Sequence, residues 1–239
     1  MISKLEKDKT NNDKALMEIH IRALFPVNSE NFIYPFEKFK HPLPFMILGR
    51  TKKGNIFKLR LDLPVELSKV LTEYLSNEDV LETPESKPRF YKRYLAEIEK
   101  YYKIKNVWLG AAFKFPGIRI NQRNCEVLTG ENFSLLKKSF PGLDTFENIK
   151  PVVSKNEDGK YVSVCFSSRL TAFAAEAGVE TLRNYRRRGY AAESVIMWES
   201  IIRGKNIIPL YSCSWDNKSS IALAAKLKLK LYGSTFHIS

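Results

Sequence analysis

Three consecutive arginines followed by a glycine carry the clearest chemical signal in this sequence. The segment Arg186-Arg187-Arg188-Gly189-Tyr190-Ala191 separates an apolar run that predicts a strand from a run with helical spacing. The N-terminus of a helix presents unpaired amide groups and the positive end of the helix dipole, which together attract an anion. Because glycine leaves this backbone uncovered, we expect phosphate groups to bind here.

A second polar segment follows the next predicted strand. Residues 209–217 read Pro-Leu-Tyr-Ser-Cys-Ser-Trp-Asp-Asn and lead into an alanine-rich helix and then into residues 227–233. Asparagine is a favoured N-cap residue, so a purely structural role is one interpretation of Asn217.

The two segments together resemble the GNAT N-acetyltransferase superfamily. Arg-x-x-Gly-x-Ala between a strand and a helix is similar to its acyl-CoA pyrophosphate loop, Gln/Arg-x-x-Gly-x-Gly/Ala, and Asn217 before a helix is similar to its second motif. The resemblance covers about residues 105–239 and is strongest over 174–233. It implies an α/β (α+β) fold with a mixed central sheet flanked by helices, as in uncharacterised bacterial GNAT proteins with an N-terminal extension.

The resemblance also implies roles for individual residues. In the family, the strand before the loop pairs with the pantetheine arm, the loop amides hold the pyrophosphate, and the asparagine binds the arm near the thioester. The side chain of Arg187 is expected to face solvent. The candidate cofactor-binding residues are Thr181, Leu182, Arg186, Arg187, Arg188, Gly189, Tyr190, Ala191, Asn217 and Ser220.

The general acid departs from the family pattern. Many members carry a tyrosine seven residues after the asparagine, which protonates the leaving thiolate, whereas this chain has Ala224 there. Lys228-Leu229 likewise replaces the usual Gly-Phe. Tyr232, Tyr211 and water remain alternative sources of the proton.

Two carboxylates on the strand before the loop are candidate general bases. Glu176 and Glu180 are four residues apart, so they are expected on the same face of the strand. Transfer of an acyl group to an amine needs such a base, because only the neutral amine attacks. The alternative is a solvent-facing carboxylate, or one paired with Arg169 or Arg183.

The implied function is an N-acetyltransferase that moves an acetyl group from acetyl-CoA to an unidentified primary amine by direct attack in a ternary complex. The acceptor is left open between a small molecule, a peptide and a protein. Residues 105–239 are expected to form the catalytic domain, and residues 1–104 a substrate-side or structural extension. The alternative is a non-catalytic acyl-CoA-binding or nucleic-acid-binding protein on the same fold.

Composition narrows the class of protein. The chain has 239 residues, 44% hydrophobic and 27% charged, which excludes a disordered or collagen-like protein. The net charge of +13 suits an anionic partner.

Cys125, Cys165 and Cys213 form no metal-binding pattern, and we expect the last two to pack in the core. We expect a cytoplasmic protein without metal or membrane span, with a homodimer as one option and nucleic acid not favoured as a partner.

The elements that must position these residues follow from apolar spacing. We expect an irregular start over the first fifteen residues, hairpins over 43–61 and 150–170, and strands over 107–115, 174–182, 207–212 and 232–238. Helices are expected after Pro64, from about residue 88 to 102, and over 133–140, 189–203 and 217–228. On the helix to residue 102, the predicted apolar face is Tyr91, Leu95, Ile98 and Tyr102.

Overall fold

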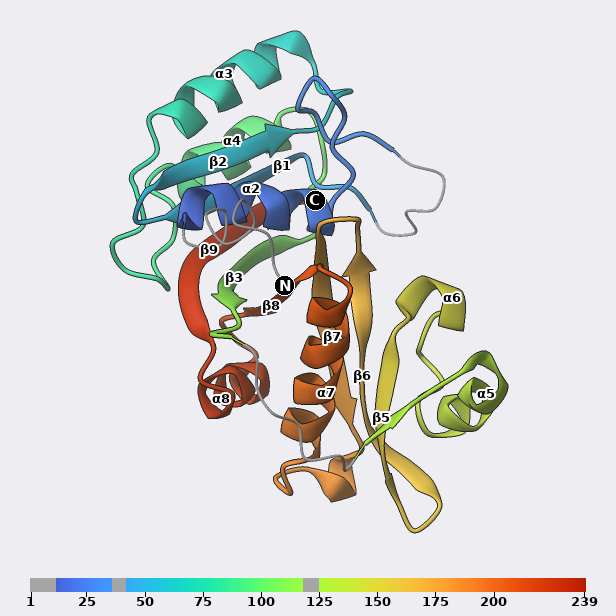
Figure 1. Cartoon of the computed structure of the whole chain (residues 1–239). Helices are drawn as coiled ribbons and strands as arrows, with labels where there is room; N and C mark the ends of the chain where they lie inside the picture. Colours follow the sequence, from blue (N-terminus) through green and yellow to red (C-terminus); the bar gives the residue numbers. More distant parts are fainter. Residues whose placement is uncertain (1–11, 36–41, 118–124) are drawn as a thin grey trace. The chain divides into compact units, whose positions relative to one another are not determined.

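The computed structural model describes residues 12–35, 42–117 and 125–239, and Figure 1 traces its elements. By their internal contacts the residues divide into two compact units. The central unit comprises mainly Phe113–Ser212 and Lys218–Lys230, and the terminal unit comprises Ser3–Ala112, Cys213–Asn217 and Leu231–Ser239. The domain boundary expected at residues 104 and 105 stays a prediction, because compactness does not show which residues a catalytic domain needs.

The terminal unit contains the strand order β2-β1-β9-β3. The bounds are β1 Met46–Thr51, β2 Gly54–Leu59, β3 Val107–Lys114 and β9 Lys230–Ile238. β1 and β2 form the predicted hairpin, in which Thr51 pairs with Gly54, and β1 also pairs antiparallel with β9. The first and last parts of the chain therefore share one group of strands.

In its described residues, this unit has the helices α2 Asp13–Leu24, α3 Val65–Ser76 and α4 Tyr91–Glu99. The helix expected after Pro64 is confirmed as α3, which buries Leu67, Leu71 and Leu75. The face predicted for α4 is confirmed, because Ile98 is buried and Tyr91, Leu95 and Tyr102 pack against the same core cluster. Tyr94 is also buried, and the helix ends before Tyr102. α2 begins inside the segment expected to be irregular, of which residues 1–11 lie outside the described residues.

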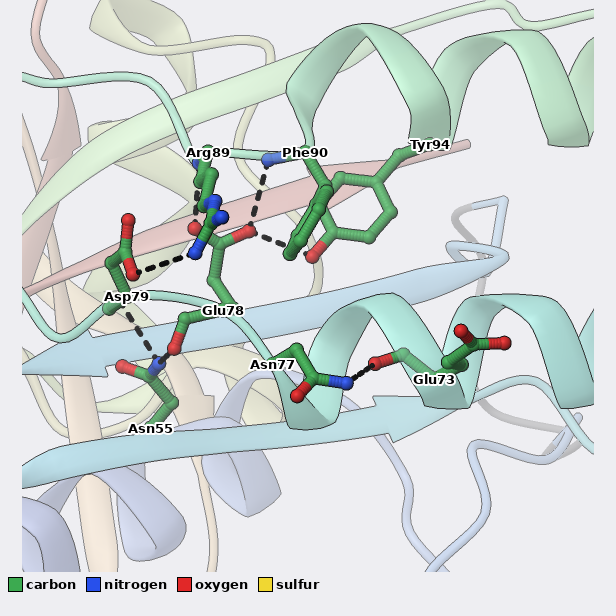
Figure 2. Close-up of polar contacts among 8 residues, drawn as sticks. All are labelled: Asn55, Glu73, Asn77, Glu78, Asp79, Arg89, Phe90 and Tyr94. Atoms are coloured by element: carbon green, nitrogen blue, oxygen red, sulfur yellow. Dashed lines mark hydrogen bonds and ion pairs between the residues drawn. The ribbon is translucent and has the colours of Figure 1, made fainter.

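A buried carboxylate joins α3 to α4 (Figure 2). Glu78, which is 7% exposed, accepts hydrogen bonds from the backbone amides of Arg89 at 2.6 Å and Phe90 at 3.3 Å. The hydroxyl of Tyr94 donates a third at 2.8 Å. Burial, followed by this bond to Glu78, raises the pKa of Tyr94. A side chain from another segment thus satisfies amides at the start of α4.

The central unit contains the strand order β8-β7-β6-β5-β4. The bounds are β4 Glu126–Val127, β5 Val152–Glu157, β6 Lys160–Leu170, β7 Ala174–Thr181 and β8 Ile208–Ser214. β5 and β6 form the predicted hairpin, and β4, β5, β6 and β7 pair antiparallel in turn. β7 and β8 pair parallel, so the sheet is mixed, as expected.

Helices flank both faces of these strands. Their bounds are α5 Gly130–Ser139, α6 Phe146–Ile149, α7 Tyr190–Gly204 and α8 Lys218–Lys226. Val164 of β6 packs in a core cluster with residues of α5 and α6, whereas Ser167 accepts a hydrogen bond from the Trp198 indole of α7 at 3.1 Å. Because residues an odd number apart face opposite sides of a strand, α7 and α5 cover opposite faces. The predicted α/β fold class is confirmed.

Two of the cysteines are buried. Cys165 is fully inaccessible and Cys213 is 5% exposed, which confirms that both pack in cores. Within the described residues, no cluster of histidine, cysteine, aspartate or glutamate has the composition of a metal site. Among those residues there is also no helix of sufficient length and apolarity to span a membrane.

Candidate functional site

The site begins where two parallel strands part. β7 pairs with β8 from Ala174 opposite Ile208 to Glu176 opposite Leu210. Among the described residues this pairing ends at Glu176, although β7 continues to Thr181. The last five residues of β7 therefore have one edge without a neighbouring strand from β8.

Alternation along β7 shows which backbone groups lie on that edge. The amide of Leu182 donates to Val162 of β6 at 3.0 Å, so the even-numbered residues face β6, and Ile208 of β8 donates to the odd-numbered Phe173. The edge toward β8 therefore carries the N–H and C=O groups of Val179 and Thr181. We did not predict Val179 from the sequence, because the strand register was needed to assign it.

The predicted pantetheine segment is well anchored on its other side. The Thr181 hydroxyl lies 2.8 Å from the hydroxyl of Ser163, which also donates to the Glu180 carbonyl at 3.2 Å. Leu182 packs against the core cluster beneath α5 and α6. β7 therefore reaches the loop with a fixed position relative to β6.

The loop leads into α7 through two left-handed residues. After the short 3₁₀ helix η1, Arg183–Tyr185, Arg187 has φ 65° and Gly189 has φ 96°. Gly189 is the N-cap residue, and glycine adopts this conformation at little cost. The amides of Ala192 and Glu193 donate to the Gly189 carbonyl. The amides of Tyr190 and Ala191 precede those bonds, which is the arrangement expected of an anion site.

The three predicted arginines have different surroundings. The Nε of Arg186 donates to the Thr181 carbonyl at 3.2 Å, on the open edge of β7. Arg187 is exposed, as expected. Nη1 of Arg188 lies 3.5 Å from the Glu157 carboxylate, and its guanidinium stacks over the Tyr185 ring.

Glu157 also binds the first residue of α7. The hydroxyl of Tyr190 donates to Glu157 Oε1 at 2.6 Å, and this hydrogen bond is the main cause of the raised pKa of the tyrosine. One turn further, Glu193 of α7 pairs with Lys155 of β5 at 3.2 Å. The β5–β6 hairpin is therefore bound to the beginning of α7.

Sequence reasoning missed one cation at this position. The ammonium of Lys226, near the end of α8, lies 3.4 Å from the point that a Cβ atom on Gly189 would occupy. Lys226 is exposed, and within the described part of the chain no carboxylate forms an ion pair with it. Its place beside Gly189 depends on how α8 packs on α7, so no local motif marks it.

The two candidate bases differ in burial. Glu176 is 4% exposed and lies across from Arg169 in the β6–β7 ladder, whereas Glu180 is exposed. Burial lowers the pKa of Arg169, and the charge of Glu176 opposes that shift. The pairing of Glu176 with Arg169 that the sequence left open is therefore favoured, and Glu180 is the accessible carboxylate.

The remaining candidates are divided between the units. Tyr211 of β8 and Ser220 of α8 belong to the central unit, where Tyr211 is 2% exposed and packs near Phe113. Asn217 and Tyr232 belong to the terminal unit. Asn217 directly precedes α8, and Tyr232 is buried with its hydroxyl hydrogen-bonded to Nδ1 of His20 in α2.

The mixed α/β sheet flanked by helices, with two parallel strands that part beside a strand–loop–helix junction, places the chain in the class of α/β proteins with a GNAT-like fold. Within that class, the family model of the GNAT acetyltransferases matches residues 90–233, more than half of the chain. The chain therefore belongs to the GNAT acetyltransferase family. No curated protein matches the sequence.

Several solved structures are similar to this chain at low sequence identity. A GNAT-family protein from Novosphingobium aromaticivorans is 16% identical, with 57% of this chain and 66% of that chain covered and a TM-score of 0.49. A GCN5-related N-acetyltransferase-like protein from Streptococcus suis is 14% identical, with 82% and 84% covered and a TM-score of 0.48. A GNAT-family acetyltransferase from Colwellia psychrerythraea is 11% identical, with 89% and 80% covered and a TM-score of 0.47. The family assignment rests on the family model.

Proposed function

We propose that this chain transfers an acetyl group from acetyl-CoA to a primary amine. The observation that carries the proposal is the start of α7, where Gly189 in a left-handed conformation leaves the amides of Tyr190 and Ala191 ahead of the first helical hydrogen bonds. The expected occupant is the pyrophosphate of an acyl-CoA, because the chain belongs to the GNAT acetyltransferase family and its loop is similar to the acyl-CoA pyrophosphate loop of that family.

The open edge of β7 supports the same assignment for the rest of the cofactor. Val179 and Thr181 present backbone groups there, and a pantetheine arm has amides that can add to a strand edge in the manner of an extra strand. Arg186 donates a hydrogen bond to the Thr181 carbonyl at this edge. Its side chain therefore lies at the position where the pantetheine arm would join the pyrophosphate in the loop. The proposed roles of Leu182, Asn217 and Ser220 follow from the family alone.

In the proposed reaction, the acceptor ammonium first gives a proton to a carboxylate, directly or through water. The neutral amine nitrogen then attacks the thioester carbon and loses its second proton, the C–S bond breaks, and the thiolate takes up a proton to leave as CoA. The exposed Glu180 suits the proton transfer better than Glu176, which is buried across from Arg169. The catalysis otherwise depends on holding the two substrates together.

The source of the proton for the thiolate stays open. Ala224, at the family's tyrosine position, is buried and has no ionisable group. Tyr211, Tyr232 and water therefore remain the alternatives. A thiol has a pKa near 8.5, so the thiolate is a tolerable leaving group and loss of the acid should matter less than loss of the base.

The test is release of free CoA thiol from acetyl-CoA in the presence of a panel of amines, preceded by a thermal-shift titration. Acetyl-CoA at a hundred times its dissociation constant should stabilise the fold by about 2.7 kcal/mol. With an active acceptor, Glu180→Gln should reduce turnover about 10²- to 10⁴-fold.

Glu176→Gln is the matched control for that carboxylate, and Tyr211→Phe and Tyr232→Phe should each reduce turnover less than Glu180→Gln. Absence of any thermal shift at millimolar acetyl-CoA would contradict the proposed cofactor. Binding without thiol release for every class of amine would instead favour the non-catalytic alternative.

A further inference from the structure

The positive charges around the start of α7 are not equally available to a ligand. Arg188 is one of the candidate cofactor-binding arginines of the loop, yet its guanidinium faces the carboxylate of Glu157 at 3.5 Å. The same carboxylate accepts the hydrogen bond of Tyr190 at 2.6 Å. Glu157 therefore places a negative charge beside both the last arginine and the first helical residue of the loop.

Lys226 has the opposite surroundings. Its ammonium lies beside Gly189, at the positive end of the α7 dipole, and no carboxylate of the described chain neutralises it. Two positive groups next to each other repel unless an anion lies between them. An ammonium held near unpaired helical amides is thus arranged so that one phosphate group can contact both.

We propose that Lys226 supplies a side-chain positive charge that contacts the phosphates of the acyl-CoA, whereas Glu157 withholds Arg188 from them. This inference rests on the proposed function and adds to it a specificity-determining pair that lies outside the loop motif. Glu157 limits affinity because its charge repels the phosphates, while its hydrogen bond to Tyr190 keeps the start of α7 in place.

The two halves of the proposal predict different changes in affinity. Lys226→Gln removes a charge in contact with phosphate and should weaken CoA binding about five- to tenfold. Arg188→Gln removes the same charge from a residue that Glu157 already neutralises, and should weaken binding less than about twofold. Glu157→Gln keeps an oxygen acceptor for Tyr190 but loses the charge, and should tighten binding about two- to fivefold.

The experiment is calorimetric titration of the full chain with CoA, and with pantetheine as a probe that lacks phosphates. Wild type, Lys226→Gln, Lys226→Arg, Arg188→Gln, Glu157→Gln and the Glu157→Gln/Arg188→Gln double variant are compared. Lys226→Arg keeps the positive charge and should bind CoA within about twofold of wild type. That result would show that the charge of the side chain determines the affinity. Arg188→Gln should cost more affinity in the Glu157→Gln background than in wild type, because only there is the arginine free. Pantetheine affinity should be the same for Lys226→Gln and wild type.

Failure of this inference is distinguishable from failure of the proposed function. If wild type binds no CoA, the cofactor assignment itself is wrong. If wild type binds CoA but Arg188→Gln weakens binding as much as Lys226→Gln or more, the proposed division of charge is overturned. It is equally overturned if Lys226→Gln melts at the wild-type temperature and binds CoA like wild type, or if Glu157→Gln weakens CoA binding.

Discussion

Two helices of this molecule begin in contrasting ways. At α4 the chain supplies its own anion, because the Glu78 carboxylate accepts the amides of Arg89 and Phe90 and is itself buried (Figure 2). At α7 the N-cap is Gly189, which has no side chain to accept the following amides. The cations nearby are Lys226 beside the glycine and Arg188 paired with Glu157.

The difference separates a structural helix start from a proposed binding one. Satisfying the amides of Arg89 and Phe90 internally stabilises the terminal unit and leaves no place for a ligand on these two groups. Leaving the α7 amides to solvent gives up that stability at a position where an external anion can restore it. The positive end of a helix favours a negative charge nearby. At α4 the side chain of Glu78 supplies that charge, and at α7 we propose that a phosphate group of the cofactor supplies it.

Removing the internal anion should have the largest effect on stability. Glu78→Ala leaves two amides and the Tyr94 hydroxyl without their acceptor, and should lower the free energy of unfolding by about 3–5 kcal/mol. Urea denaturation measures the change. Glu78→Gln retains one acceptor oxygen and should lose less, and CoA affinity of the folded fraction should be unchanged. A loss below 1 kcal/mol for Glu78→Ala would show that this carboxylate does not hold α4.

Blocking the other helix start should abolish binding instead. Gly189→Glu fills the space before α7 and brings a negative charge to the Tyr190 and Ala191 amides, so CoA affinity should fall at least about 100-fold. The left-handed φ of 96° adds a strain of about 1–2 kcal/mol for any residue with a side chain. Gly189→Ala is the matched control, because it carries that strain without the charge and should bind CoA more tightly than Gly189→Glu. Equal affinity of Gly189→Glu and wild type would place the phosphate site elsewhere.

A largely desolvated histidine should make the terminal unit sensitive to acid. Burial lowers the pKa of His237 to about 4, and its neighbours Trp108, Phe25 and the cross-strand Ile47 carry no charge. Because the folded pKa lies below the unfolded value near 6.5, the unfolded chain binds the extra proton between those values, and stability falls as pH drops from about 6.5 toward 4. The loss between pH 7 and pH 5 should be about 2 kcal/mol.

Thermal melts across this pH range measure the acid sensitivity. His237→Gln cannot take up that proton, so its stability should change less between pH 7 and pH 5 than that of wild type. The same slope in both proteins would assign the acid sensitivity to other groups.

Much of the fold could be predicted from the sequence because its apolar periodicity is local. The β5–β6 hairpin, β7, α7 and β8 all lie where spacing and turn residues indicated. α2 was missed although Asn12 caps it and Leu16, Met17 and Ile21 are buried, because the polar residues before it dominated the interpretation.

The candidate site was less predictable because its chemistry depends on contacts between distant segments. The motif identified Gly189 and its loop, which are contiguous. Assigning Val179 to the edge that faces β8 requires the hydrogen-bond register of β7. The ion pair that neutralises Arg188 comes from Glu157 in the distant β5–β6 hairpin. The position of Lys226 beside Gly189 depends on how α8 packs on α7. None of these relations has a pattern in the linear sequence.

Hydrogen–deuterium exchange of the backbone amides with and without CoA tests the central claim most directly. If a CoA phosphate completes the start of α7, saturating CoA should slow exchange in residues 179–192, above all at the amides of Tyr190 and Ala191, and leave the amides of Arg89 and Phe90 unchanged. Slower exchange at the start of α7 with no change at α4 would agree with a helix start that a ligand completes. Unchanged exchange over residues 179–192 at saturating CoA would contradict the account.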